Sequence, residues 1–215
     1  MNASIEPSLT RGEYWLLNNV VDSTCPICFL VSDQIEELFN NPGHRLSPPR
    51  LVETLTSMVQ RGWIEGYRCE DAAPLTAAEI EKGFLERPTE EGLELGYRLT
   101  ETGGAIWEAF AAPNWDRYLH VWTSAEGEMN EWFCAIRWRL EKYLSLVHFM
   151  DVLVQPESIE WDEVVPWEAT YWKTLPHGHR VRFLHMDVQA EFDGPKDLNR
   201  VPHTVMNLKR WYDWE

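Results

Sequence analysis

The chain has 215 residues, of which 44% are hydrophobic, and its formal net charge is −16. This length corresponds to one large domain or two small ones, and the hydrophobic content excludes a disordered chain. No stretch approaches the roughly 18 apolar residues of a membrane span, and the first twenty residues lack the apolar region of a secretory signal. We therefore expect a globular, cytoplasmic protein that does not enter a membrane.

Tryptophan and negative charge are the two unusual features of the composition. Nine of the twelve tryptophans follow residue 113. Large aromatic side chains either fill a core or anchor a binding interface. The negative charge repels nucleic acid and anionic lipid, and it favours a basic protein as a partner.

Three helices are predicted in the first part of the chain. Hydrophobic periodicity indicates helices over 11–21 and 32–39. A third helix over 48–61 has Ser47 as its N-cap and Pro48 at its first position, and Gly62 ends it.

The next segment contains two predicted strands and two further helices. Strands are expected over 63–68 and 93–99. Between them, Thr76-Ala-Ala-Glu79 is a capping box that starts a helix over 76–86. Thr100 is expected to cap a last helix that ends before Pro113.

This order of elements resembles the winged helix-turn-helix domain of PadR-like and MarR-like regulators. The resemblance rests on the segment LVETLTSMVQRGWIEGYR and on the strand end formed by Tyr97, Leu99, Thr100 and Gly103. It implies that 48–61 is a recognition helix and that 63–99 forms a wing. The predicted fold class is α+β, with a winged-helix-like domain over 1–112 that carries a helical insertion in its wing.

The charge of the wing departs from that of DNA-binding relatives. Residues 69–94 carry eight acidic side chains and two basic ones, although each phosphate contact requires a cation. Over 44–61 the cations Arg45, Arg50 and Arg61 outnumber a single acidic residue. These three arginines are the candidate DNA-binding residues of a second hypothesis, a transcription regulator.

The remaining residues, 113–215, are predicted to form a Trp-rich α+β module. A long helix is expected from Met129 to Val147. Residues 181–192 alternate in polarity and predict a strand that buries Leu184 and Met186. Residues 165–175 fit either a helix from Pro166 or a strand.

Two clusters have residue types that bind metals. Cys25 and Cys28 have the spacing of half a zinc site or of a redox motif, with His44 and Cys69 as the nearest further ligands. His177, His179 and His185 form the second cluster. The alternative to metal binding is a pair of buried thiols for Cys25 and Cys28 and a turn at Pro176-Gly178 for the histidines. We therefore assign no metal ligand and no cofactor.

A cationic segment of the second half is the candidate partner-binding site. Residues 173–185 contain three cations and no acid, so they could receive an acidic group of a partner or balance nearby glutamates. The predicted partner-binding residues are Lys173, His177, His179, Arg180, Arg182, Trp211 and Trp214.

The sequence contains no motif of a hydrolase or of a nucleotide-binding enzyme. We therefore predict a non-enzymatic, acidic interaction protein that docks a basic protein, as an immunity protein or antitoxin does. The alternatives are the winged-helix transcription regulator and a metal-dependent enzyme that uses one of the two clusters.

Overall fold

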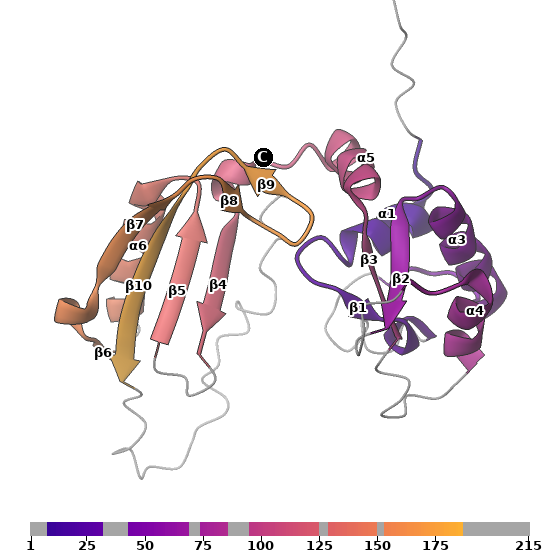
Figure 1. The fold of residues 1–215 in the computed structure, drawn as a ribbon, viewed down its shortest axis with the longest axis horizontal. Helices are drawn as coiled ribbons and strands as arrows, with labels where there is room; N and C mark the ends of the chain where they lie inside the picture. The colour runs from indigo at the N-terminus through magenta and orange to yellow at the C-terminus, as the bar shows by residue number, and fades with distance from the viewer. Residues whose placement is uncertain are drawn as a thin grey trace, which may run out of the picture. The chain divides into compact units, whose positions relative to one another are not determined.

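The computed structural model describes residues 8–31, 43–68, 74–85, 95–124, 129–149 and 153–186. The predicted helix over 32–39, most of the acidic wing residues, Cys69, Trp211 and Trp214 lie outside these ranges. The fold is α+β, with helices and antiparallel sheets (Figure 1). Unit 1 consists of residues 1–112 and 170–173, and unit 2 consists of 113–169 and 174–215. The inclusion of 170–173 in unit 1 was not predicted from the sequence.

Unit 1 combines a small sheet with several helices. Its antiparallel sheet has the strand order β1-β3-β2. The strands are β1 (Cys25–Pro26), β2 (Ile64–Arg68) and β3 (Leu95–Leu99). The helices are α1 (Arg11–Asn18), the short 3₁₀ helix η1 (Ile27–Val31), α3 (Pro48–Gln60), α4 (Ala77–Leu85) and α5 (Glu101–Ala111).

Local sequence signals explain where these helices begin and end. The predicted capping box is confirmed, because the Glu79 amide donates to Thr76 Oγ1 while Glu79 accepts from the Thr76 amide. Thr100 caps α5 by accepting from the Gly103 amide at 3.0 Å. Helix α3 begins at Pro48 as predicted, and Gly62 follows it with a left-handed φ of 67°.

The core of unit 1 lies between its helices and its sheet. The Tyr97 hydroxyl donates to the Leu16 carbonyl at 3.1 Å, which joins β3 to α1 inside this core. Helix α5 closely approaches the backbone just before β2, since a Cβ on Gly103 would lie 1.8 Å from the Trp63 carbonyl oxygen. The largest fully buried side chains of unit 1 include Leu16, Leu17, Leu51, Leu55, Met58, Ile64, Tyr97 and Trp107.

Unit 2 is built around an antiparallel sheet of order β4-β5-β10-β6, in which β7 also pairs with β10. The main strands are β4 (Leu119–Thr123), β5 (Met129–Cys134), β7 (Glu160–Val164) and β10 (Gly178–Met186). The other elements are η3 (Trp115–Arg117), α6 (Arg137–Phe149), β6 (Leu153–Val154), η4 (Pro156–Ser158), β8 (Trp167–Glu168) and β9 (Thr174–Leu175).

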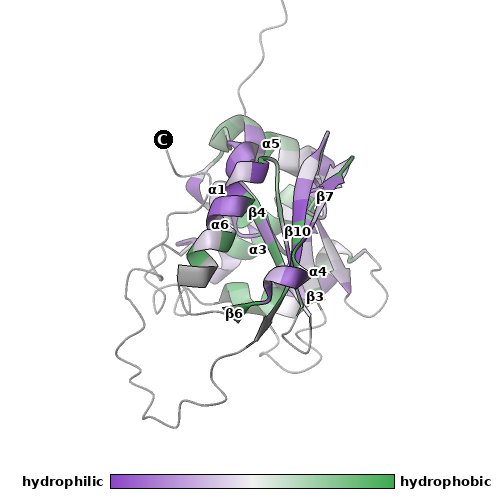
Figure 2. Cartoon of the chain, turned by 90° about the vertical axis from the view of Figure 1, so that its left-hand side faces the viewer, coloured by the Kyte–Doolittle hydropathy of each residue, from purple (hydrophilic) through white to green (hydrophobic). Residues whose placement is uncertain are grey.

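Helix α6 packs against one face of this sheet, which we call the helix face. Leu140 and Leu144 of α6 join Cys134, Val181 and Phe183 of the strands in one buried cluster. In Figure 2 the ribbon of α6 alternates between hydrophilic and hydrophobic residues, as expected of a helix with one buried side. The opposite face, called the outer face, is partly covered by Trp167, whose ring stacks on Phe133.

The structure corrects two predictions for unit 2. Residues 129–134 form strand β5 and the helix begins only at Arg137, because β5 pairs with β4 and β10 on its two sides. The predicted phase of β10 is also wrong for Leu184, which is half-buried, whereas Val181 and Phe183 fill the core. Over 165–175, which the sequence left undecided, the short strands β8 and β9 pair with each other.

None of the helices within the described residues is long and apolar enough to span a bilayer.

Candidate functional site

Two of the three candidate DNA-binding arginines, Arg50 on α3 and Arg61 at its C-terminal end, pair with carboxylates of unit 1. Arg50 Nη1 lies 2.7 Å from Glu53 Oε2, one turn along the same helix. Arg61 pairs with Glu13 of α1, and its guanidinium lies 3.6 Å from the centre of the Trp63 ring. Arg45 is exposed and precedes α3, with a left-handed φ of 56°. Phosphate binding by Arg50 or Arg61 would have to replace these internal contacts.

Glu13 binds the Arg61 side chain at the C-terminal end of α3 through its carboxylate. Its carboxylate accepts hydrogen bonds from the Thr10 amide at 2.8 Å, from the Thr10 hydroxyl at 2.7 Å and from Arg61. Burial alone would raise the pKa of Glu13, but the hydrogen bonds from Arg61 and Thr10 outweigh it and lower the pKa below its ordinary value. The Glu13–Arg61 pair therefore connects α1 to α3 as a structural contact.

Arg180 and Arg182, two of the predicted partner-binding residues, lie on the outer face of unit 2 among carboxylates. Arg182 Nε is 2.7 Å from Glu131 of β5, and Arg180 Nη2 is 2.7 Å from Asp162 of β7. Hydrogen bonding to Glu131 raises the pKa of Arg182. Of the two alternatives for this cationic segment, these contacts match the one in which its arginines balance acidic residues of the same chain.

Lys173 lies in unit 1, whereas Arg180 and Arg182 lie in unit 2. Its ammonium group is 2.6 Å from Glu108 of α5, and both side chains are about three-quarters buried. The three cations that are close in sequence thus belong to different units, and each pairs with a carboxylate. Trp211 and Trp214 fall outside the described residues.

The histidine cluster is spread along β10 and the turn before it. His179 pairs in register with Cys134 and Glu163, and His185 pairs with Val154. His177 precedes the strand. Within the described residues, no group of three histidine, cysteine or acidic side chains is placed to hold a metal ion.

Cys25 and Cys28 lie in unit 1 as free thiols. Burial raises the pKa of the Cys28 thiol, which favours its protonated form. Buried His44, the nearest candidate ligand, bonds through Nε2 to the Leu30 carbonyl at 2.9 Å and accepts at Nδ1 from the Leu46 amide at 3.0 Å. Both ring nitrogens are therefore engaged, and a zinc ion would have to displace one of these bonds.

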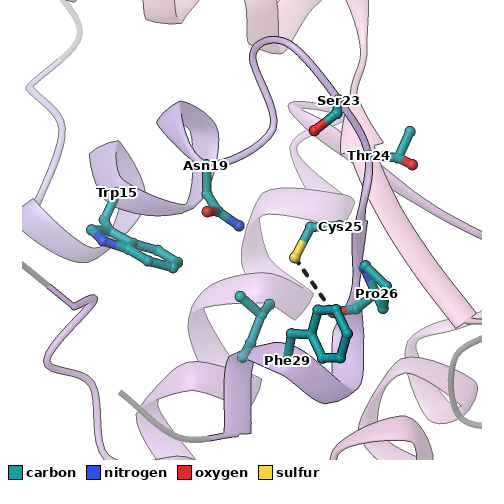
Figure 3. A pocket seen from close by; sticks show the side chains of 8 residues that line it. Trp15, Asn19, Ser23, Thr24, Cys25, Pro26 and Phe29 are labelled. Atoms are coloured by element: carbon teal, nitrogen blue, oxygen red, sulfur yellow. Dashed lines mark hydrogen bonds between the residues drawn. The ribbon is translucent and has the colours of Figure 1, made fainter. Parts of the chain in front are cut away.

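A hollow of about 260 Å³ opens beside Cys25 (Figure 3). The aromatic rings of Trp15 and Phe29 lie on two sides of it, and the Asn19 amide and the Cys25 thiol lie between them. The remaining lining residues are Ser23, Thr24, Pro26 and Leu30. Asn19 Nδ2 donates to the Tyr97 hydroxyl at 3.3 Å, and Cys25 Sγ donates to the Pro26 carbonyl. The Asn19 amide nitrogen and the Cys25 thiol on its wall thus already have partners within unit 1.

Sequence reasoning missed the packing of residues 170–173 in unit 1. The Tyr171 hydroxyl donates to the Val20 carbonyl and accepts from the Leu99 amide, and Trp172 Nε1 donates to the Val21 carbonyl at 2.9 Å. No local pattern predicts these bonds, because their partners lie more than 70 positions away in the chain.

Sequence reasoning also missed the exposure of strand β4. Val121 is 50% exposed and Trp122 is 47% exposed, although both are large apolar residues in the middle of a strand. Among the described residues β4 pairs only with β5, so it lies at an edge of the sheet (Figure 1). The tryptophan count signalled an aromatic surface but did not locate it.

No protein family, curated protein or solved structure matches the chain.

Proposed function

We propose that unit 1 is a winged-helix domain whose wing carries α4 as an insertion. The support is the element order, in which α1, β1 and α3 precede the pair β2 and β3, together with the strand order β1-β3-β2. Helix α4 lies between the two wing strands in sequence and packs against α3 and η1. In this proposal α3 is the helix that a DNA-binding relative would present to the major groove.

We infer that the protein is a non-enzymatic, acidic interaction protein of the cytoplasm that docks a basic protein. The observation that carries this inference is the pairing of Arg50 and Arg61 with Glu53 and Glu13. Glu13 of α1 holds Arg61, so Arg61 is poorly placed to release counterions from a polyanion, whereas the exposed Arg50–Glu53 pair is weak and adds less to this argument. The net charge of −16 then favours association with a partner of opposite sign.

An immunity-like or antitoxin-like role fits the same features. Such proteins neutralise a basic toxin through charge complementarity, and aromatic side chains anchor their interfaces. Exposed Trp122 is an aromatic residue of this kind in unit 2.

The proposal is tested by isothermal titration of the full chain with the basic proteins encoded by neighbouring genes. We expect one of them to bind, with an affinity that falls as salt is added, since screening weakens attraction between opposite net charges. Binding that is insensitive to salt, or no binding by any of these proteins, would contradict the inference.

The second candidate is a winged-helix transcription regulator that contacts DNA through Arg45, Arg50 and Arg61. The element order of unit 1 supports it through its resemblance to a winged helix, a scaffold that many DNA-binding proteins use. A gel-shift assay at low salt with the upstream DNA separates the two candidates. Retardation by wild type that Arg50→Ala weakens would support the regulator.

A further inference from the structure

We propose that the free edge of β4 in unit 2 docks an extended segment of the partner, which adds a strand to the sheet. The basic character of that segment rests on the proposed function, whereas the docking edge is argued from the geometry of the sheet.

On the side of β4 that faces away from β5, no strand among the described residues pairs with its backbone. The Ser124 amide donates to the Met129 carbonyl at 2.8 Å, which shows that the groups of Ser124 point toward β5. Hydrogen-bonding direction alternates along an antiparallel strand, so His120 and Trp122 also point toward β5. The amide and carbonyl groups of Leu119, Val121 and Thr123 therefore point away from β5, where an added strand would pair with them.

The two edges of this sheet differ in how they resist strand addition. Proteins usually protect an edge with charged side chains, proline or short strands. Strand β7 carries Glu160, Asp162 and Glu163, and η4, which begins at Pro156, separates it from β6. Strand β4 has the sequence Leu-His-Val-Trp-Thr, with no acidic residue, lysine, arginine or proline. Of these two edges, β4 is the one that shows none of these protective features within the described residues.

The edges of the sheet in unit 1 are also short or covered. Strand β1 has only two residues and includes Pro26. On the other side of that sheet, Tyr67 of β2 forms a β-bridge with Pro74, and the Leu75 amide donates to the Gly66 carbonyl. This comparison leaves β4 as the edge best suited to a partner strand.

The side chains of β4 provide an anchor on each face of the sheet. Val121 is opposite Trp132 and shares the helix face, whereas Trp122 is opposite Glu131 and shares the outer face. Alternate side chains of an added strand would lie beside one or the other. Tryptophan is enriched among residues that dominate binding energy, so Trp122 is the expected anchor.

Charge decides which occupant the edge favours. A second copy would bring a net charge of −16 toward an equal charge, which opposes association. A basic segment is attracted instead, and the residues that follow β4 in sequence include Glu126 and Glu128. We therefore assign the edge to a partner segment with apolar residues at alternate positions and lysine or arginine beside them.

Amide hydrogen exchange of the full chain tests the edge before any partner is known. The amides of Val121 and Thr123 are expected to exchange fast, and that of Trp122, which faces β5, is expected to exchange slowly. Protection of the Val121 amide in the free monomer would show that another part of the chain covers the edge, which overturns the proposal. A concentration-dependent dimer that protects the same amides would overturn it in favour of a second copy.

The docking step is tested with a phage-displayed library of random dodecapeptides and the full chain. Enriched peptides are expected to be basic, to alternate apolar residues and to protect the Val121 and Thr123 amides. Their binding should weaken at least about tenfold in Val121→Pro, which removes one outward amide, and in Trp122→Ala. Trp138→Ala is the matched control, since Trp138 is 52% exposed on α6, and it should bind normally.

The outcomes separate the edge from the proposed function. If no peptide is enriched, or if peptides bind Val121→Pro and Trp122→Ala as well as wild type, the edge proposal fails. If a basic protein binds wild type and both variants equally, docking at the β4 edge is contradicted, but the proposed function is still supported. Acidic peptides at the edge would support strand addition and count against a basic partner. If Val121→Pro fails to fold by circular dichroism, Trp122→Ala still decides the test.

Discussion

The Tyr171 hydroxyl donates a 2.5 Å hydrogen bond to the carbonyl of Val20, a residue 151 positions earlier in the chain. The same oxygen accepts a hydrogen bond from the Leu99 amide at 2.8 Å. One side chain thus satisfies a carbonyl that follows α1 and an amide at the end of β3, both within unit 1. Desolvation of the hydroxyl raises the pKa of this phenol, although the residue as a whole is 42% exposed.

Tyr171→Phe should destabilise unit 1 by about 1–3 kcal/mol, because it leaves a backbone carbonyl and an amide without their partner. Chemical denaturation, monitored through the hydrogen exchange of unit 1 amides, measures the change in the free energy of unfolding. Tyr143→Phe is the control, since the Tyr143 hydroxyl accepts a partly buried 3.3 Å bond from the Arg139 side chain and bonds to no backbone group among the described residues. Equal effects of the two substitutions would contradict the role given to Tyr171.

Gly103→Ala should destabilise unit 1 by about 3 kcal/mol or more, because the new Cβ would meet the Trp63 carbonyl oxygen, which cannot rotate away. Gly62→Ala is the matched control. Gly62 has a left-handed φ but open space around it, so its substitution should cost only about 1 kcal/mol. Urea denaturation compares the two variants, and a larger loss for Gly62→Ala would contradict the account of α5 packing.

Unit 1 should lose stability in acid through Glu13. The pKa of Glu13 is lower in the folded chain than its ordinary value of 4.5, so the unfolded chain binds the proton more readily. Its contribution is therefore complete well above pH 4.5 and is lost as the pH falls through the folded pKa. Glu13→Gln should reduce this acid dependence, as measured by urea denaturation across the acidic range. An unchanged dependence would contradict the role of Glu13.

The arginines of α3 should differ in their effect on stability. Arg61→Ala is expected to cost about 1–2 kcal/mol, since it leaves the buried Glu13 carboxylate with one partner fewer. Arg50→Ala should change stability by less than about 0.5 kcal/mol, because Arg50 and Glu53 are 71% and 66% exposed. Thermal denaturation of both variants checks this order, and a larger cost for Arg50→Ala would contradict it.

The sequence predicted well those elements whose ends are marked by local chemistry. Pro48 and Gly62 mark α3, and Thr76 and Thr100 mark the starts of α4 and α5, because caps and left-handed glycines act over a few residues. The matching capping box of Thr10 and Glu13 at α1 follows the same pattern but was not used in the prediction.

The sequence predicted less well those elements that depend on distant partners. Met129, Trp132 and Phe133 have a spacing that also fits a helix, and only pairing with β4 and β10 makes this segment a strand. In β10 apolar residues occur at both odd and even positions, so alternation could not decide between Val181 and Leu184 as the core residue.

The candidate site also combines features that local sequence predicts with features that depend on distant partners. The sequence identified the cations of α3 and of 173–185, but their carboxylate partners come from other elements, as with Glu13 for Arg61 and Glu131 for Arg182. Exposure of Val121 could not be predicted either, because it depends on β4 being the last strand of the sheet.

We infer that this acidic protein does not bind DNA. A gel-shift titration of the full chain against its own upstream DNA at low salt is the most direct test of this inference. A basic protein that binds the chain is the positive control. We expect no retardation of the DNA at micromolar protein, under conditions in which the basic protein forms a complex. Retardation of the DNA that Arg50→Ala weakens would contradict the account and favour the transcription regulator.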